Sequence, residues 1–409
     1  MNCRFCGARL DQVFLDLGSA PPSNAYLDAA ALQAPEAWFP LKLHACGECR
    51  LVQVDEVQHH SALFSPDYAY FSSYSRSWLA HARAFVDTAR ERLALHGGDL
   101  VVEVASNDGY LLQYVQAAGI RCLGIEPTRS TAQVARERGI ETVECFLGAA
   151  TARALVAKHG QASLVVANNV LAHVPDINDF VAGLALLLSP RGTLTLEFPH
   201  LARLVEHGQF DTVYHEHFSY FSLHTAVRVL AAHGLATWDA EALPTHGGSL
   251  RLWVRHADAG VAPSERLAGL LAREQAEGLL DDAYYRGFQD RADALKNDLL
   301  SFLIEQKRQG RRVVGYGAAA KGNTLLNYAG VRPDLLPWVV DASPHKQGKY
   351  LPGSRIPIVN ESYIREHRPD VVLVLPWNLR EEITAQLGYL SEWGGRFAVA
   401  IPRLEVFPA

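Results

Sequence analysis

The sequence lacks the long hydrophobic runs that would cross a membrane. None of its apolar stretches approaches the ~20 residues that span a bilayer, and the longest, around Val181 to Leu188, has the length of a core helix. The first residues, Met1 to Cys6, contain no apolar signal segment. No short repeat or low-complexity segment occurs. These absences predict a cytoplasmic protein with no membrane partner.

An excess of positive charge is also lacking. Lys and Arg number 38 against 44 for Asp and Glu, so the formal net charge is −6. Proteins that bind nucleic acid or anionic membranes need a basic face, so we expect neither partner. The chain of 409 residues, 49% of them hydrophobic, is instead long and apolar enough for two or three globular domains.

Cysteine is scarce, but four of the six cysteines form two CxxC pairs. The pairs are Cys3 with Cys6 and Cys46 with Cys49. Four thiolates suit a closed tetrahedral zinc site, which stabilises a segment too small to build its own core. Gly7 and Gly47 are the turn residues that would bring each pair of sulfurs to one face. A redox CxxC is the alternative, but a redox motif would not come doubled. We predict structural zinc, with a small loop-rich insertion between the pairs, and we expect Cys122 and Cys145 to be buried, inert thiols.

Strand and helix patterns alternate after a helical stretch at 77–95. Buried strands are expected at 100–104, 122–125, 164–167 and 193–198, which predicts a mostly parallel sheet. An antiparallel hairpin is expected from strands at 236–242 and 249–255, a charged helical stretch at 262–309, and a second strand–helix alternation from 312 onward. The predicted fold class is α/β in three domains: a zinc-binding lobe at 1–75, a central Rossmann-like domain at 76–260, and a helical linker with a C-terminal Rossmann-like domain at 261–409.

A candidate nucleotide-binding turn follows the strand at 100–104. A strand, a turn of small residues and a helix start let backbone approach a nucleoside cofactor closely. Glu126, at the end of the next strand, can take both ribose hydroxyls. The loop has a single glycine, Gly109, which fits NAD poorly and leaves an ordinary buried turn as the alternative. The cofactor-binding candidates are Glu103, Ala105, Ser106, Asn107, Gly109, Glu126, Asn168 and Asn169.

The densest group of titratable side chains is the run Tyr214, His215, Glu216 and His217. One histidine among 17 is more often a surface or core residue than a catalyst. Four consecutive titratable groups in an aromatic-rich segment, however, are costly to bury without a purpose. We therefore interpret this run as catalytic. His173 follows the third strand, at the sheet edge where α/β folds bind their ligands.

A second strand, glycine turn and helix start occurs at residues 312–323. It could hold a pyrophosphate through backbone amides, with Lys321 adding charge, and Asp341 ends the following strand. An NAD site here would make the protein an oxidoreductase, but nothing after Asp341 supplies a site for hydride transfer. A nucleotide-sugar anchor suits these residues better, and a lobe without a ligand is the remaining alternative.

These motifs occur together and in order, and with them the chain resembles a known family. The paired CxxC start, Glu-Val-Ala-Ser-Asn-Asp-Gly, Asn-Asn-Val-Leu-Ala-His-Val and Tyr-His-Glu-His resemble those of S-adenosylmethionine-dependent sugar C-methyltransferases that act on nucleotide-linked 4-keto-deoxysugars. The resemblance spans the whole chain, including Gly315 to Asn323. It implies a zinc-binding first domain, a class I methyltransferase domain that binds S-adenosylmethionine, and a third domain that helps to hold the nucleotide sugar.

The resemblance also implies roles for individual residues. It places the catalytic base at His217, since histidine, with a pKa of ~6.5, is the usual base at neutral pH. His217 would take the proton from carbon 3 of a dTDP-linked 4-keto-deoxysugar of antibiotic biosynthesis, and the enolate would attack the methyl group. His173 and Tyr214 would hydrogen-bond the sugar and the enolate oxygen. Glu216 is the competing base, but it would need a strongly raised pKa.

Several alternatives stay open. Carbon 5 also lies next to the ketone and could be the methylated atom, and the fold could serve a non-catalytic nucleotide-sugar-binding module. Tyr68, Tyr70 and Tyr74 would either contact substrate or form an aromatic seam between domains. His246 would either touch the sugar or simply make the hairpin turn. The substrate-binding candidates are Tyr68, Tyr70, His246, Lys321, Asn323 and Asp341.

Overall fold

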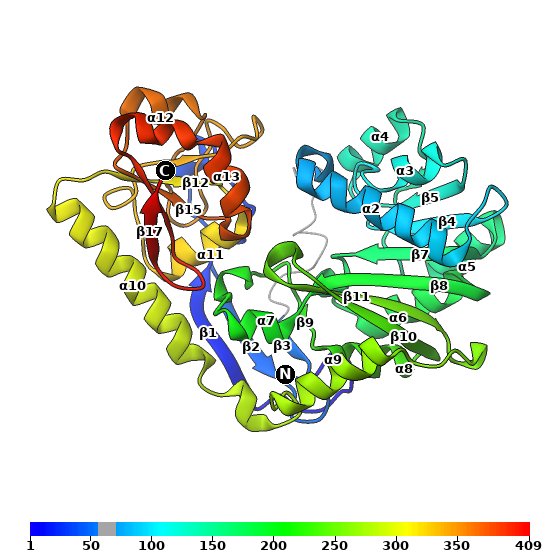
Figure 1. Cartoon of the computed structure of the whole chain (residues 1–409). Helices are drawn as coiled ribbons and strands as arrows, with labels where there is room; N and C mark the ends of the chain where they lie inside the picture. The colour runs from blue at the N-terminus through cyan, green and yellow to red at the C-terminus, as the bar shows by residue number, and fades with distance from the viewer. Residues whose placement is uncertain (56–70) are drawn as a thin grey trace.

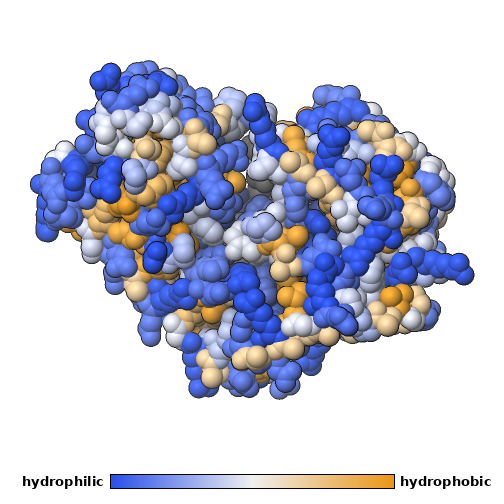
Figure 2. All heavy atoms as spheres, viewed as in Figure 1, coloured by the Kyte–Doolittle hydropathy of each residue, from blue (hydrophilic) through white to orange (hydrophobic). Residues whose placement is uncertain are grey.

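The computed structural model describes residues 1–55 and 71–409, which form three β-sheets with their covering helices (Figure 1). The central sheet lies on the right of Figure 1, the C-terminal sheet at the upper left, and a small N-terminal sheet below and between them. In space-filling form the same view is indented between the two large lobes, and its surface is mostly hydrophilic (Figure 2). Among the described helices, none is both long and apolar enough to cross a membrane.

The N-terminal sheet is antiparallel and has the order β1-β2-β3-β9. Its strands are β1 (Gln12–Ala20), β2 (Phe39–Ala45), β3 (Val52–Val54) and β9 (Ser219–Tyr220). The insertion between the CxxC pairs contributes two of these strands, where short apolar pieces at 13–15 and 41–43 favour strands. The fourth strand comes from the middle of the chain, directly after the Tyr-His-Glu-His run.

The central sheet has the order β10-β11-β8-β7-β4-β5-β6. Its strands are β4 (Leu100–Val104), β5 (Arg121–Ile125), β6 (Thr142–Val143), β7 (Ala162–Asn168), β8 (Leu188–Pro199), β10 (Leu235–Leu243) and β11 (Ser249–His256). β4 to β8 pair in parallel, while β11 runs antiparallel to both neighbours, so the predicted parallel sheet and terminal hairpin are confirmed. The helices of this lobe are α2 (Arg76–Leu93), α3 (Leu112–Ala117), α4 (Arg129–Glu137), α5 (Ala149–His159), α6 (Ile177–Leu187), α7 (Leu201–Glu206) and α8 (Leu223–Ala231).

The C-terminal sheet has the order β14-β13-β12-β15-β16-β17 and is parallel except for its last strand. Its strands are β12 (Val313–Tyr316), β13 (Val339–Val340), β14 (Ile358–Val359), β15 (Val371–Val374), β16 (Arg396–Val399) and β17 (Glu405–Pro408). The remaining helices are α9 (Glu265–Ala276), α10 (Phe288–Arg308), α11 (Ala320–Tyr328), α12 (Ser362–His367) and α13 (Arg380–Gln386). The second strand–helix alternation is therefore confirmed.

The N-terminal sheet shares its hydrophobic core with the C-terminal lobe. Phe14 of β1 stacks on Phe288 of α10, with ring centroids 4.9 Å apart, and α10 runs beside β1 in Figure 1. The cluster continues without a break from Leu15 and Leu43 to Leu373 in the C-terminal sheet. The cysteines of the CxxC pairs pack instead against the core of the central lobe. The small first sheet thus joins the two large lobes.

Candidate active site and zinc centre

The four CxxC sulfurs converge on one point. Cys3 Sγ lies 3.5 Å from Cys49 Sγ, and Cys6 Sγ lies 3.6 Å from Cys46 Sγ. All four ligand atoms lie within 4.8 Å of one another, and three of the four side chains are buried. Tetrahedral zinc with Zn–S bonds of about 2.3 Å separates its sulfurs by about 3.8 Å. The donor set and its spacing therefore fit one zinc ion with no open position.

The two cysteine turns differ from the expectation in one detail. Gly7 has φ +75° as expected of a turn glycine, and its N–H donates to the Cys3 carbonyl. In the second turn the left-handed residue is Arg50, with φ +63°, and Gly47 is not in that conformation. In both turns the residue with left-handed φ comes directly after the second cysteine of the pair, not between the two cysteines. The two other cysteines are half-buried rather than buried, and burial raises the pKa of Cys122 to about 11, which keeps its thiol protonated.

The loop after β4 has a strained backbone. Ala105 and Asn107 adopt φ +57° and +50°, and Asn169 at the end of β7 adopts φ +52°. Such left-handed conformations cost non-glycine residues about 1–3 kcal/mol each and concentrate at functional sites. Gly109 has φ +77°, a conformation in which any side chain would be strained, and a Cβ there would lie 2.4 Å from Ile140 Cδ1.

Unpartnered polar atoms gather at the same edge of the central sheet. Ser106 Oγ and the side-chain oxygen of Asn169 are buried and lack a hydrogen-bond partner within the described part of the chain. The fully buried Glu103 carboxyl group interacts with the Tyr110 hydroxyl, which also interacts with Asn168. Burial raises the pKa of Glu103 well above its usual value, and the nearby Glu126 charge adds to the shift. Buried polar groups in folded proteins are normally satisfied. A polar, cationic ligand such as S-adenosylmethionine fits this group of acceptors.

Glu126 shapes the cofactor loop. Its carboxylate accepts backbone N–H groups from Asn107 at 2.8 Å and from Thr128 at 2.9 Å. Each carboxylate oxygen retains a further lone pair, so the predicted contact to ribose hydroxyls is compatible with this arrangement. The C-terminal lobe has a similar arrangement: the carboxylate of Asp341, which follows β13, accepts from the backbone amides of Ala318 and Ser343, both at 2.8 Å.

His217 lies in a cluster of aromatic and imidazole rings. Its ring centroid is 3.9 Å from that of Tyr214, 4.6 Å from that of His173 and 5.9 Å from that of Tyr220. The Nδ1–H of His217 donates to the Thr212 carbonyl at 3.0 Å. This bond fixes the proton of the neutral ring on Nδ1 and leaves Nε2 as the acceptor. Because burial is the main effect and other cationic groups surround it, the pKa of His217 falls well below 6.5.

The neighbours of His217 have different orientations. His173 Nδ1 lies 2.9 Å from the Glu216 carbonyl, and burial lowers the pKa of His173 to about 4. The two oxygens of the Glu216 carboxylate accept from the Asn24 amide, at 2.9 and 3.0 Å, in the loop between β1 and β2. His215 faces the carbonyls of Phe39 and Pro40 in β2. Two of the four consecutive titratable residues therefore bind the N-terminal lobe.

His246 both makes the hairpin turn and faces the site. It has φ +54°, its ring centroid lies 5.1 Å from Trp78, and the Asn169 amide lies 3.4 Å from its Nε2. Burial lowers the pKa of His246 to about 4. His246 thus connects the end of β7 with the hairpin. The two interpretations of His246, as a residue of the hairpin turn and as a contact to the sugar, are therefore compatible.

The C-terminal candidates divide between two places. Lys321 donates to Asn378 Oδ1 at 2.8 Å and lies over the Trp377 ring, 4.8 Å from its centroid. Its charge also acts on His217 and His246, which places it on the side of the catalytic cluster. Asn323 instead donates to the Ser23 carbonyl at 2.6 Å and ties α11 to the first lobe. Asp341 lies behind the loop after β12, where it also binds Lys346 at 3.3 Å.

Two of the three predicted tyrosines, Tyr68 and Tyr70, lie outside the described residues. Tyr74 is 67% exposed and lies 6.5 Å from the His345 ring of the C-terminal lobe, on which Phe71 also stacks at 6.0 Å. The described end of this segment is therefore an aromatic contact between lobes.

A buried ionic network beside the site gave no recognisable signal in the sequence. The fully buried carboxylate of Glu197, at the end of β8, binds His81 at 2.9 Å, Arg251 at 2.7 Å and Thr245 Oγ1 at 3.0 Å. The His81 ring also stacks on Trp78 at 5.0 Å. The spacing of Trp78 and His81 on one face of α2 is the only sequence feature that could have indicated it.

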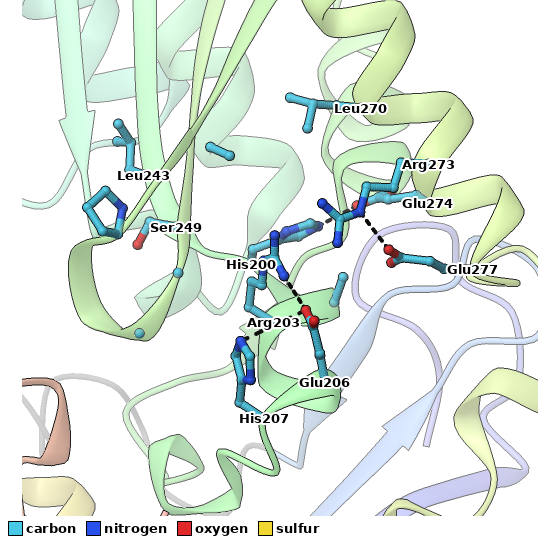
Figure 3. A pocket seen from close by; sticks show the side chains of 15 residues that line it. His200, Arg203, Glu206, His207, Leu243, Ser249, Leu270, Arg273, Glu274 and Glu277 are labelled. Carbon is cyan, nitrogen blue, oxygen red and sulfur yellow. Dashed lines mark hydrogen bonds and ion pairs between the residues drawn. The ribbon is translucent and has the colours of Figure 1, made fainter. Parts of the chain in front are cut away.

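A pocket of about 380 Å³ lies between the β10–β11 hairpin, α7 and α9 (Figure 3). The charged side chains that line it form ion pairs with one another: Arg203 with Glu206, Arg273 with Glu277, and His200 with Glu274. None of the predicted site residues is among its lining side chains. This pocket is therefore lined by side chains other than those of the predicted site.

Comparison with known proteins identifies the family. Family models match three consecutive parts of the chain: "Putative zinc binding domain" at 3–64, "Methyltransferase domain" at 78–240 and "C-methyltransferase C-terminal domain" at 244–402. C-methyltransferase NovU of Streptomyces niveus is 36% identical over 408 residues, which cover 100% of this chain and 97% of NovU. The chain belongs to the S-adenosylmethionine-dependent C-methyltransferases.

Solved methyltransferase structures are similar to this C-methyltransferase over about half of its length. The 1,6-didemethyltoxoflavin-N1-methyltransferase of Burkholderia thailandensis is 17% identical with a TM-score of 0.37, over 51% of this chain and 95% of its own. The magnesium protoporphyrin IX methyltransferase of Synechocystis PCC 6803 is 17% identical with a TM-score of 0.32, over 44% and 81%.

The fold and cofactors of this C-methyltransferase follow. Its central lobe has the class I methyltransferase fold, and its cofactors are S-adenosylmethionine and zinc. The family membership decides against an NAD-dependent oxidoreductase and a non-catalytic module. The C-terminal Rossmann-like lobe is part of the matched enzyme.

Proposed function

We propose that this enzyme methylates carbon 3 of a dTDP-linked 4-keto-deoxysugar in the biosynthesis of an antibiotic sugar. The motifs resemble those of sugar C-methyltransferases, and a 36% identical relative is named as a C-methyltransferase. A carbon nucleophile requires loss of a C–H proton, and a hydrogen next to a ketone is acidic enough for a histidine base.

The hydrogen bond from His217 Nδ1 to the Thr212 carbonyl carries the proposal. It leaves the Nε2 lone pair as the only basic position of the ring, and the lowered pKa keeps that ring neutral at pH 7. His217 Nε2 takes the proton from carbon 3. The electron pair of the C–H bond moves into the carbon 3–carbon 4 bond, and negative charge develops on the carbon 4 oxygen.

The rings beside His217 suit the developing enolate. Tyr214, with its ring 3.9 Å from His217, is the donor assigned to the carbon 4 oxygen. His173 donates its Nδ1–H to the Glu216 carbonyl, so its Nε2 is assigned as an acceptor for a sugar hydroxyl. S-adenosylmethionine, bound by the Glu103 and Glu126 edge, supplies an electrophilic methyl group. Carbon 3 would form the new C–C bond as the bond between sulfur and the methyl carbon breaks, with S-adenosylhomocysteine as the leaving group and the carbon 4 ketone restored. The proton stays on His217 until it leaves to solvent. Glu216 is a weaker candidate for the base, because its carboxylate is turned to Asn24.

The nucleotide part is assigned to the C-terminal lobe. Lys321, at the start of α11, faces the same side as His217 and carries the positive charge that a pyrophosphate needs. Asp341 positions the preceding loop through the Ala318 amide. Tyr68 and Tyr70 lie outside the described residues and stay predicted substrate contacts.

The test incubates the enzyme with S-adenosylmethionine and dTDP-4-keto-6-deoxyglucose, followed by mass spectrometry and NMR. The expected product is heavier by one CH₂ unit, with the new methyl group on carbon 3. His217→Asn is expected to abolish turnover while retaining cofactor binding, and Glu216→Gln to retain far more activity than His217→Asn. A methyl group on carbon 5 or on oxygen, or an active His217→Asn enzyme, contradicts the proposal.

A further inference from the structure

The short segment before the catalytic run is held from the C-terminal lobe. This segment, the turn at residues 209–213, contains the Thr212 carbonyl that accepts from His217 Nδ1 at 3.0 Å. Trp377 Nε1–H donates to Asp211 Oδ2 at 2.8 Å, and Thr324 Oγ1–H donates to the Val213 carbonyl at 2.8 Å. The C-terminal lobe therefore binds the residue on each side of Thr212.

The Thr324 contact is buried, and the Trp377 contact is partly buried. Asp211 and Val213 are fully buried, and Thr324 is 3% exposed. Buried hydrogen bonds of this kind are worth about a factor of ten in an equilibrium and hold their groups in one geometry. Since the peptide of Thr212 lies between two fixed neighbours, the direction of its carbonyl is fixed as well.

The same tryptophan also touches the hairpin that carries His246. A Cβ on Gly247 would lie 2.2 Å from the Trp377 ring, so the tip of the hairpin packs directly on the indole. The Gln209 side chain donates to the Gly247 carbonyl at 2.8 Å and closes this contact from the other end of the turn. Trp377 thus lies between the turn 209–213 and the hairpin tip.

We propose that Trp377 and Thr324 are positioning residues for the catalytic base: from the C-terminal lobe they fix the Thr212 carbonyl, which holds His217 in the tautomer with a basic Nε2. The C-terminal lobe then acts in the proton-abstraction step as well as in substrate binding. The inference rests on the proposed role of His217 as the base. Neither residue touches the reacting atoms, and both act through Thr212.

The variants Trp377→Phe and Thr324→Val remove the donors with little change of shape. The matched controls are Trp393→Phe and Thr384→Val in the same lobe, whose side chains donate to the Pro369 and Glu381 carbonyls at 3.0 and 3.1 Å.

The first measurement is deuterium wash-in at carbon 3 of the 4-keto sugar in D₂O, with S-adenosylhomocysteine in place of the methyl donor. Each positioning variant is expected to lower the exchange rate and kcat about tenfold, the rate equivalent of one buried hydrogen bond. The KM of each positioning variant for S-adenosylmethionine is expected to stay within about twofold of the wild-type value. The control variants are expected to show wild-type exchange rates and kcat. Wild-type exchange in both positioning variants, or in their double variant, overturns the inference.

The second measurement needs no substrate. Nitrogen-15 NMR of histidine-labelled enzyme reports which ring nitrogen of His217 carries the proton, with His217→Asn assigning the signal. Wild-type enzyme is expected to show a protonated Nδ1, and the double variant a mixture of tautomers. An unchanged tautomer in the double variant overturns the positioning role. Absence of exchange in the wild-type enzyme, with the tautomer shift present, refutes the proposed reaction and leaves the positioning intact.

Discussion

Neutralising Glu274 tests how much one buried carboxylate stabilises the junction between α7, α8 and α9. Glu274 is 2% exposed and accepts from His200 at 2.6 Å, from His224 at 2.8 Å, and from the Leu223 and His224 amides at 2.6 and 2.9 Å. These contacts outweigh desolvation and lower the pKa of Glu274 from 4.5 to about 2. At 1.36 kcal/mol per pKa unit, the ionised form contributes about 3 kcal/mol to the free energy of unfolding.

Glu274→Gln is therefore expected to lower the free energy of unfolding by about 3 kcal/mol at pH 7, measured by urea denaturation. Because the folded pKa is depressed, this contribution is complete above about pH 4.5 and disappears as the pH falls towards 2. Glu277→Gln on the same helix is the control, because its exposed pair with Arg273 is worth less than about 1 kcal/mol. A loss below about 1 kcal/mol at pH 7, or one that stays the same at pH 3, refutes this reasoning.

Three further predictions concern the sites. With His217 as the proposed base, its lowered pKa predicts that kcat/KM falls only below pH 6.5 and is flat above it, because the ring must be neutral to accept a proton; an acid limb centred above pH 7 contradicts this. Glu126→Ala is expected to weaken S-adenosylmethionine binding about 10- to 100-fold by calorimetry, since charge-assisted hydrogen bonds to the ribose are lost; unchanged affinity argues against its role. Cys46→Ser is expected to lower the zinc content by atomic emission and the yield of folded enzyme; full zinc occupancy would show that the thiols are not the ligands.

The architecture was predictable wherever the local sequence determines the structure. β4, for example, is a run of five residues buried on both sides, so its hydrophobic pattern is visible in any context. The hairpin of β10 and β11 is marked by Gly247 and Gly248 between two apolar strands. The zinc site was predictable because cysteine spacing alone defines it. β9 was not predictable, because a strand of two residues, Ser219 and Tyr220, carries no pattern of its own.

The candidate site was predictable in composition but not in orientation. The sequence groups Glu216 with His217, yet the carboxylate turns to Asn24 while the imidazole turns to the Thr212 carbonyl. These directions depend on partners about 190 residues away for Glu216 and on the fold of the preceding turn for His217. The contact of Trp377 with the turn before His217 arises only when the C-terminal lobe docks. No local rule relates residues so far apart in the chain.

The late strand β9 has a consequence for how the enzyme is made. The ribosome finishes β3 at Val54, but the strand that pairs with it, at Ser219 and Tyr220, emerges only about 10–30 s later at 5–20 residues per second. The stacking partner of Phe14, Phe288 of α10, follows later still. The first fifty residues are therefore synthesised long before the residues that complete their sheet and core. During that interval their apolar strands are exposed to chaperones. Zinc capture by the cysteine pairs and the pairing of β1, β2 and β3 are the stabilising steps open to the nascent N-terminal lobe before β9 is synthesised.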